Sequence, residues 1–285
     1  MKMNHSVIIA VALSSVFSFA ANAQQLKMPA ASPTQTIKQD FALSEITIEY
    51  SRPGVKGRVI YGDLVPFGKI WRTGANDATK ITFGSNVNVG GRPVDAGTYA
   101  MYSIPGKDSW DIMLYKDLEL GGSVNDYKPE NELLRIKVKP TALSNKVETF
   151  TIQVADITSS EANIELLWDK TMVSFKVTAE IDAQIIKNIE ASLKSDTRPY
   201  FQAANYYYDN DKDMNQALEW VSKAIEINPK RFWVVHLKAK IQMKIKDYKG
   251  AISTAEQSLA LSKEQKNDDY IQMNEKLIAE AKKKN

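Results

Sequence analysis

Cationic side chains gather in one irregular stretch of the sequence, SRPGVKGRVIYGDLVPFGKIWRTGAND, which runs from Ser51 to Asp77. Arginine binds carboxylates and phosphates through a planar fork, and glycines allow backbone N–H groups to approach the same anion. Aromatic residues in the stretch, Trp71 and Tyr61, offer faces for a sugar ring or a cation. We therefore expect a site for a small anion or an acidic glycan. Its candidate residues are Arg52, Lys56, Arg58, Trp71, Arg72 and Asn76.

A second interpretation of this basic loop stays open. Arg52, Arg58 and Arg72 would instead brace the loop by bonding to backbone carbonyls and to Asp63. A third interpretation is catalytic, with Asp63 and Asp77 acting as acid and base of a hydrolase that cleaves an envelope carbohydrate or ester. A purely structural scaffold is the remaining alternative.

Several chemistries are excluded by residue types that the chain lacks. It has no cysteine and two histidines, His5 and His236, so thiolate catalysis, disulfides and a His- or Cys-coordinated zinc site at the loop are not expected. There is no GxxxxGK[ST] segment and no strand-linked GxGxxG segment. We assign no cofactor, no metal ion and no catalytic residue. The net charge of +3 also argues against nucleic acid as a partner.

The first 23 residues have the pattern of a signal peptide. Lys2 precedes an apolar run, 7–20, and Ala21-Asn22-Ala23 is a small-x-small cleavage site. The run is short for a membrane span. We expect a chain that is exported to the periplasm or the exterior, soluble, and without a transmembrane segment after cleavage.

Short strands are predicted from 40 to 180, after a polar linker at 24–39. Apolar and polar residues alternate at Ile46, Ile48 and Tyr50, and Gly90-Gly91 and Pro105-Gly106 are among the turns between runs. Many short strands at hairpin spacing predict an antiparallel β-sandwich. The runs are 46–50, 80–83, 86–89, 98–104, 110–115, 133–139, 147–155, 163–168 and 172–178.

Helical periodicity begins near Ile181 and continues to the end of the chain. Small residues recur about 34 residues apart, because Ala217-Leu218 is followed by Ala251-Ile252. The spacing resembles the tetratricopeptide repeat. Residues 181–285 are therefore predicted to form a tetratricopeptide-like, all-α array. We expect most aromatic residues of this region to pack between the helices, and those on its concave surface to bind a peptide or helix of a protein partner.

Three segments carry a family resemblance: SRPGVKGR (51–58), GDLVPFGKIWRTGAND (62–77) and DAGTYAMYSIPG (95–106). They resemble an exported bacterial family, common in Bacteroidetes, that is catalogued as domain of unknown function 2911. The resemblance covers residues 41–178 and implies a β-sandwich, but no activity. The sequence as a whole favours a non-catalytic binding or adaptor protein.

Overall fold

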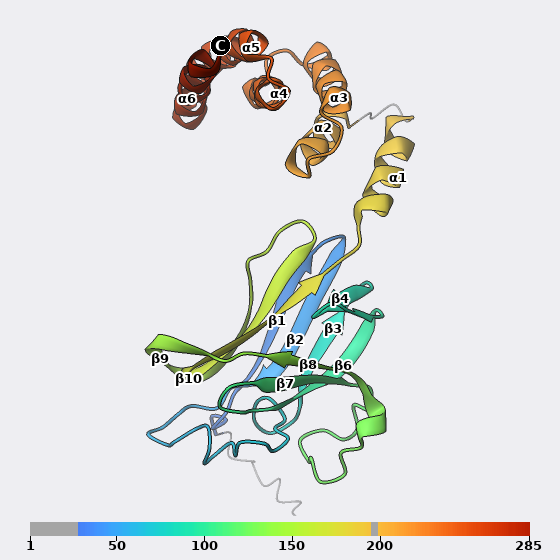
Figure 1. Cartoon of the computed structure of the whole chain (residues 1–285), viewed down its shortest axis with the longest axis vertical. Coiled ribbons are helices and arrows are strands. Elements are labelled where there is room, and N and C mark those ends of the chain that lie inside the picture. Colours follow the sequence, from blue (N-terminus) through green and yellow to red (C-terminus); the bar gives the residue numbers. More distant parts are fainter. Residues whose placement is uncertain (1–27, 195–198) are drawn as a thin grey trace, which may run out of the picture. The chain divides into compact units, whose positions relative to one another are not determined.

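The computed structural model describes residues 28–194 and 199–285. The chain divides into two compact units between Val177 and Thr178, a β-domain and a helical domain (Figure 1). The predicted signal peptide at 1–23 lies outside the described residues. In the described part of the chain, no helix has the length and apolar character needed to cross a membrane.

The described part of the β-domain, from residue 28 onward, contains two sheets. The larger sheet has the order β1-β2-β3-β6-β7-β8, and all five of its pairings are antiparallel. The smaller sheet has the order β5-β4-β10-β9. The larger sheet consists of β1 (Thr34–Phe41), β2 (Ser44–Ser51), β3 (Thr79–Phe83), β6 (Gly97–Ile104), β7 (Trp110–Tyr115) and β8 (Glu132–Val138). The smaller one consists of β4 (Val87–Val89), β5 (Arg92–Val94), β9 (Thr141–Ala155) and β10 (Glu161–Thr178), and a 3₁₀ turn spans Pro129–Asn131.

The core lies between the sheets, as the alternating pattern requires. Ile46, Ile48 and Tyr50 of β2 are all buried. The Tyr50 hydroxyl reaches β9 of the smaller sheet, where it donates to the carbonyl of Ile152 and accepts from its N–H, at 3.2 and 2.9 Å. Burial raises the pKa of Tyr50, which keeps the hydroxyl protonated as a donor. The prediction of an antiparallel sandwich is confirmed.

Two details of the strand prediction are wrong. The linker predicted at 24–39 ends earlier, because Thr34 begins β1, which pairs along its whole length with β2. This edge strand is half exposed, and its backbone hydrogen bonds to β2 define it. Its polar side chains lack the alternating apolar pattern by which a strand is predicted from sequence. The runs 163–168 and 172–178 belong to one strand, β10, whose register shifts between Leu167 and Thr171. The bulge interrupts the period-two pattern without ending the strand.

The second unit has six helices within its described residues, 178–194 and 199–285. They are α1 (Asp182–Leu193), α2 (Tyr200–Asp209), α3 (Met214–Ile227), α4 (Phe232–Lys244), α5 (Tyr248–Glu264) and α6 (Asp268–Lys284). Asp213, Asp247 and Asn267 cap α3, α5 and α6 by accepting hydrogen bonds from first-turn N–H groups. The sequence also predicts Asp196 or Thr197 as the cap of the helix that begins near Pro199, and both residues lie outside the described ones.

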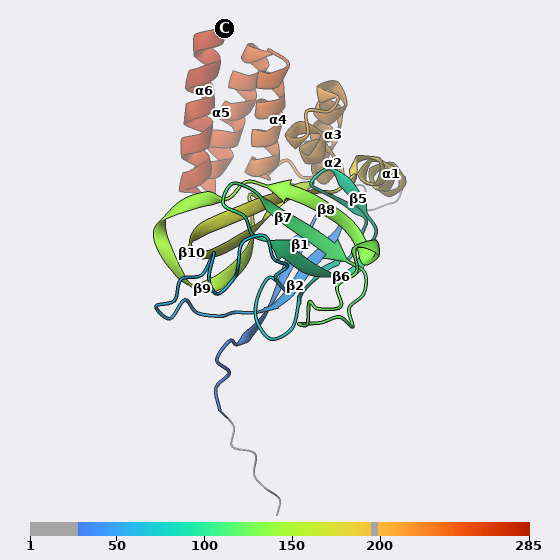
Figure 2. The ribbon, with the colours of Figure 1, turned by 60° about the horizontal axis from the view of Figure 1, so that its bottom comes forward.

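Small side chains allow these helices to pack closely. Ala217, Ala251 and Ala255 are fully buried. α2 packs on α3, and α5 lies between α4 and α6, as Figure 2 shows. The predicted all-α second part of the chain is confirmed.

Candidate anion-binding site in the loop pocket

The basic loop between β2 and β3 encloses a pocket of about 300 Å³, which we name the loop pocket. The loop contributes most of its lining, and strand β10 and the segment before β1 complete it. The lining residues are Ser32, Pro53, Arg58, Leu64, Val65, Trp71, Arg72, Gly74, Ala75, Asn76 and Trp168. Four of the six candidate residues, Arg58, Trp71, Arg72 and Asn76, thus meet in one cavity.

Two tryptophans give the pocket an apolar wall. Trp71 stacks on Trp168 of β10 with ring centroids 5.8 Å apart and planes 16° apart. The Trp71 indole N–H donates to the carbonyl of Gly74 at 2.9 Å, and the Trp71 backbone exchanges two hydrogen bonds with Ser103 of β6. Trp71 is therefore held by both sheets and by its own loop.

Arg58 and Arg72 both brace the loop and line the pocket. Arg58 donates to the carbonyls of Val55 and Gly54 at 3.1 and 2.6 Å, and Arg72 donates from Nη1 to the carbonyl of Asn76 at 2.8 Å. A guanidinium has five N–H donors. Arg58 uses two of them and Arg72 uses one within the described part of the chain. The remaining donors leave each arginine able to bind an anion without leaving its brace.

Arg52 and Lys56 do not line the pocket. Arg52 donates to the carbonyl of Phe150 at 3.0 Å and to the Thr151 hydroxyl at 2.8 Å, which ties the loop to β9. The Lys56 backbone N–H donates to the Glu148 carboxylate at 2.7 Å. This bond, followed by that of Lys146, holds the pKa of Glu148 below its ordinary value. For Arg52 the bracing interpretation describes the geometry, whereas the Lys56 ammonium donates to the carbonyl of Ala31 at 3.4 Å.

The WRTGAN segment of the loop holds unusual backbone conformations. Thr73 and Asn76 have φ angles of 55° and 59°. A β-branched residue at positive φ is strained, and such strain persists only where the surroundings enforce it. Here the buried Thr73 hydroxyl lies 2.9 Å from the Ser103 hydroxyl, and its carbonyl accepts from the Thr79 hydroxyl at 2.6 Å. These bonds fix the segment that carries Arg72 and Asn76.

A second loop, between β7 and β8, closes over this segment at Gly122. A Cβ atom on Gly122 would lie 2.0 Å from the carbonyl oxygen of Asn76 and 2.9 Å from Nη1 of Arg72. Only glycine permits that approach. Gly122 and the wall residue Trp168 were not predicted for the site. Both residues are far from 51–77 in the sequence, so no local pattern indicates that they belong to the site.

Tyr61 does not offer its face to the pocket. Its ring packs edge-on in the aromatic core, 5.0 Å from Trp110 and 6.4 Å from Trp71 between centroids. Burial, followed by the charge of Asp169, raises the pKa of Tyr61. Of the two predicted stacking residues, the structure brings only Trp71 to the pocket.

Carboxylates are absent from the described lining of the loop pocket. Asp77 accepts a hydrogen bond from the N–H of Ala78 at 2.8 Å and lies 3.6 Å from the Lys80 ammonium, whereas Asp63 is exposed. Neither lines the cavity. Across residues 28–194 and 199–285, no group of three or more His, Cys, Asp or Glu side chains is placed to hold a metal ion.

Fold and site together define a two-sheet antiparallel β-domain that presents an arginine- and tryptophan-lined pocket, joined to a helical domain. The model of the family described as "Protein of unknown function (DUF2911)" matches residues 32–177, just over half of the 285-residue chain. The chain belongs to this family. No curated protein and no solved structure matches it.

Proposed function

We propose that this chain is an exported, non-catalytic binding protein. Its loop pocket binds a small organic anion, such as an acidic sugar, and its tetratricopeptide-like helices bind a protein partner. The observation that carries the proposal is the pocket lining, where Arg58 and Arg72 stand beside Trp71 and Trp168 and no carboxylate of the described chain neutralises them.

The energetics of the pocket favour an anion with an apolar face. A hydrogen bond to a charged group contributes about 1.5–3 kcal/mol, which corresponds to a roughly ten- to hundredfold change in affinity. Tryptophan side chains add apolar contact for a ring. A volume of about 300 Å³ suits a small ligand, comparable to one or two sugar units.

Titration calorimetry with glucuronate, galacturonate and glucose 6-phosphate, with glucose as the neutral comparison, tests the pocket. The wild type should bind at least one anion more tightly than glucose. Arg72→Gln should weaken that binding at least tenfold, because it removes the cation but keeps a polar side chain.

The matched control is Lys69→Gln. Lys69 belongs to the same basic loop but does not line the pocket, and it is exposed. The Lys69→Gln variant should bind the same anion with an affinity within twofold of that of the wild type. Equal losses in both variants would attribute binding to net charge alone, and equal affinity of the wild type for glucose and every anion would refute the anion site.

A further inference from the structure

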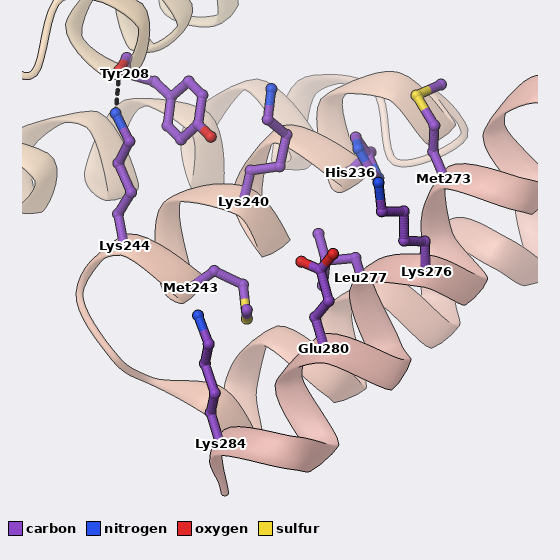
Figure 3. A pocket seen from close by; sticks show the side chains of 10 residues that line it. All are labelled: Tyr208, His236, Lys240, Met243, Lys244, Met273, Lys276, Leu277, Glu280 and Lys284. Carbon is purple, nitrogen blue, oxygen red and sulfur yellow. Dashed lines mark hydrogen bonds between the residues drawn. The ribbon is translucent and has the colours of Figure 1, made fainter.

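A groove of about 500 Å³ lies between α4 and α6 in the helical domain, and we name it the helical groove (Figure 3). Helical spacing places its residues on one face of each helix. On α4, His236, Lys240 and Lys244 are four residues apart, and on α6 Lys276 and Lys284 are eight residues apart. Tyr208, from the end of α2, closes one side.

The groove is strongly cationic in an almost neutral chain. Four lysines line it, and Glu280 is the single carboxylate of the described lining. Lys244 is paired with Asp211 at 2.6 Å. Within the described residues, the other three ammonium groups, those of Lys240, Lys276 and Lys284, have no carboxylate partner within ion-pairing distance.

Two of these like charges share one aromatic ring. The ammonium groups of Lys240 and Lys244 lie 4.4 and 4.2 Å from the centroid of Tyr208, and Lys244 also donates to the Tyr208 carbonyl at 2.7 Å. Like charges one helical turn apart repel each other. An anion bound beside Tyr208 would relieve that repulsion. The charge of Lys240 also reaches His236, whose pKa is lowered by burial and then further by this lysine.

The spacing of the lysines indicates an extended ligand. Eight residues of α-helix rise about 12 Å, so Lys276 and Lys284 are spread along the length of the groove. An extended peptide places side chains of the same face about 7 Å apart. Carboxylates two to four residues apart along a peptide therefore match the distribution of the lysines.

The groove also has an apolar floor. Met243 and Leu277 lie between the lysines, as Figure 3 shows, and Met273 also lines the groove. Methionine side chains adapt to ligands of irregular shape. An apolar floor between cations suits a chain that alternates acidic and apolar side chains, whereas a polar glycan would leave the floor without a partner.

We propose that the helical groove binds an extended acidic segment of a protein partner, with carboxylates contacting Lys240, Lys276 and Lys284 and apolar side chains resting on Met243 and Leu277. The inference deepens the proposed partner-binding role of the helices and does not depend on the loop pocket.

Fluorescence anisotropy with the whole protein tests the inference. The probes are three labelled nonapeptides in which leucine alternates with glutamate, glutamine or lysine. Only the glutamate peptide should bind, and its affinity should fall at least tenfold in the Lys240→Gln/Lys276→Gln double variant. Lys238→Gln/Lys282→Gln is the matched control, because it makes the same change of charge on the same two helices outside the groove.

If both double variants weaken binding equally, or if inorganic phosphate or heparin displaces the peptide at lower concentration than an unlabelled copy does, the inference is overturned. Equal binding of glutamate and glutamine peptides, unaffected by Lys240→Gln/Lys276→Gln, would overturn it but leave a partner-binding role for the helices. If none of the three peptides binds, the result contradicts both the acidic-segment inference and the partner-binding role of the helices. Circular dichroism of each variant confirms that its helices are retained.

Discussion

Trp71 of the basic loop stacks on Trp168 of β10, with ring centroids 5.8 Å apart. The pair joins the loop to the smaller sheet, while the Trp71 backbone pairs with Ser103 of the larger one. A loop fixed to both sheets can hold its arginines in place before a ligand arrives. Preorganisation of this kind reduces the ordering cost of binding.

Trp168→Ala should destabilise the β-domain by about 3–5 kcal/mol, the usual cost of removing a large buried aromatic side chain. Trp168 is 1% exposed and also contacts Phe150 and Tyr61. Urea unfolding followed by circular dichroism measures the loss. Leu64→Ala, at an exposed position of the same pocket, should cost less than about 1 kcal/mol. Similar losses for the two variants would show that the stack contributes little.

Gly122→Ala should weaken ligand binding without a change of charge. The added methyl group would lie 2.0 Å from the Asn76 carbonyl oxygen, which is also the acceptor of Arg72. The two loops must separate, at a cost of about 1–3 kcal/mol. Thermal unfolding and anion titration measure both effects.

Gly54→Ala is the comparison for this glycine. A Cβ atom there meets its nearest neighbour at 3.4 Å, an ordinary contact. Its stability and its anion affinity should stay close to those of wild type. If Gly122→Ala behaves in the same way, the close approach of the two loops is not needed for the site.

Asp182 attaches α1 to the next helical hairpin. Its carboxylate accepts hydrogen bonds from the Tyr206 hydroxyl of α2 and from the Lys212 ammonium. The bond from Lys212, and then that from Tyr206, lowers the pKa of Asp182. Asp182→Asn should therefore speed amide hydrogen exchange in α1 and leave exchange in α5 and α6 unchanged. Asp209→Asn, on the neighbouring helix, is the control, and equal exchange in both variants would contradict this role.

The sequence predicted those parts of the molecule whose signals are local. Alternation at Ile46, Ile48 and Tyr50 marked a sandwich strand, and the small residues Ala217 and Ala251 marked close helix packing. The edge strand β1 was not predicted, because its pairing with β2 defines it and its own side chains show no strand pattern. Arg52 was grouped with the site because spacing cannot show side-chain direction.

The partners that complete each site are distant in sequence. Trp168 reaches Trp71 only through the packing of two sheets. The lysines of the helical groove were not singled out either, since they lie on two helices that become neighbours through α5. Each lysine alone has the ordinary pattern of an exposed helix face, so three-dimensional packing was needed to reveal the cluster.

His236 should make the helical domain less stable in weak acid. Burial lowers its pKa below the ordinary value of 6.5, Lys240 lowers it further, and the bond to Asn274 opposes both. Asn274 donates its amide to Ser258 and to the Tyr270 carbonyl, so its oxygen is the acceptor and Nδ1 of His236 carries the proton. The neutral ring thus already makes its buried hydrogen bond to Asn274, and a second proton would add a positive charge that the charge of Lys240 disfavours.

The sign of the pH effect follows from this depressed pKa. Below pH 6.5 the unfolded chain binds a proton that the folded ring resists, so stability is present above that pH and is lost as the pH falls through the folded pKa. The melting temperature should fall from pH 7.5 to 5.5 more in wild type than in His236→Gln. NMR titration of the ring should give a pKa below 6.5 in wild type and one closer to 6.5 in Lys240→Gln. A wild-type value at or above 6.5 would contradict the burial of a neutral ring beside the lysines of the groove.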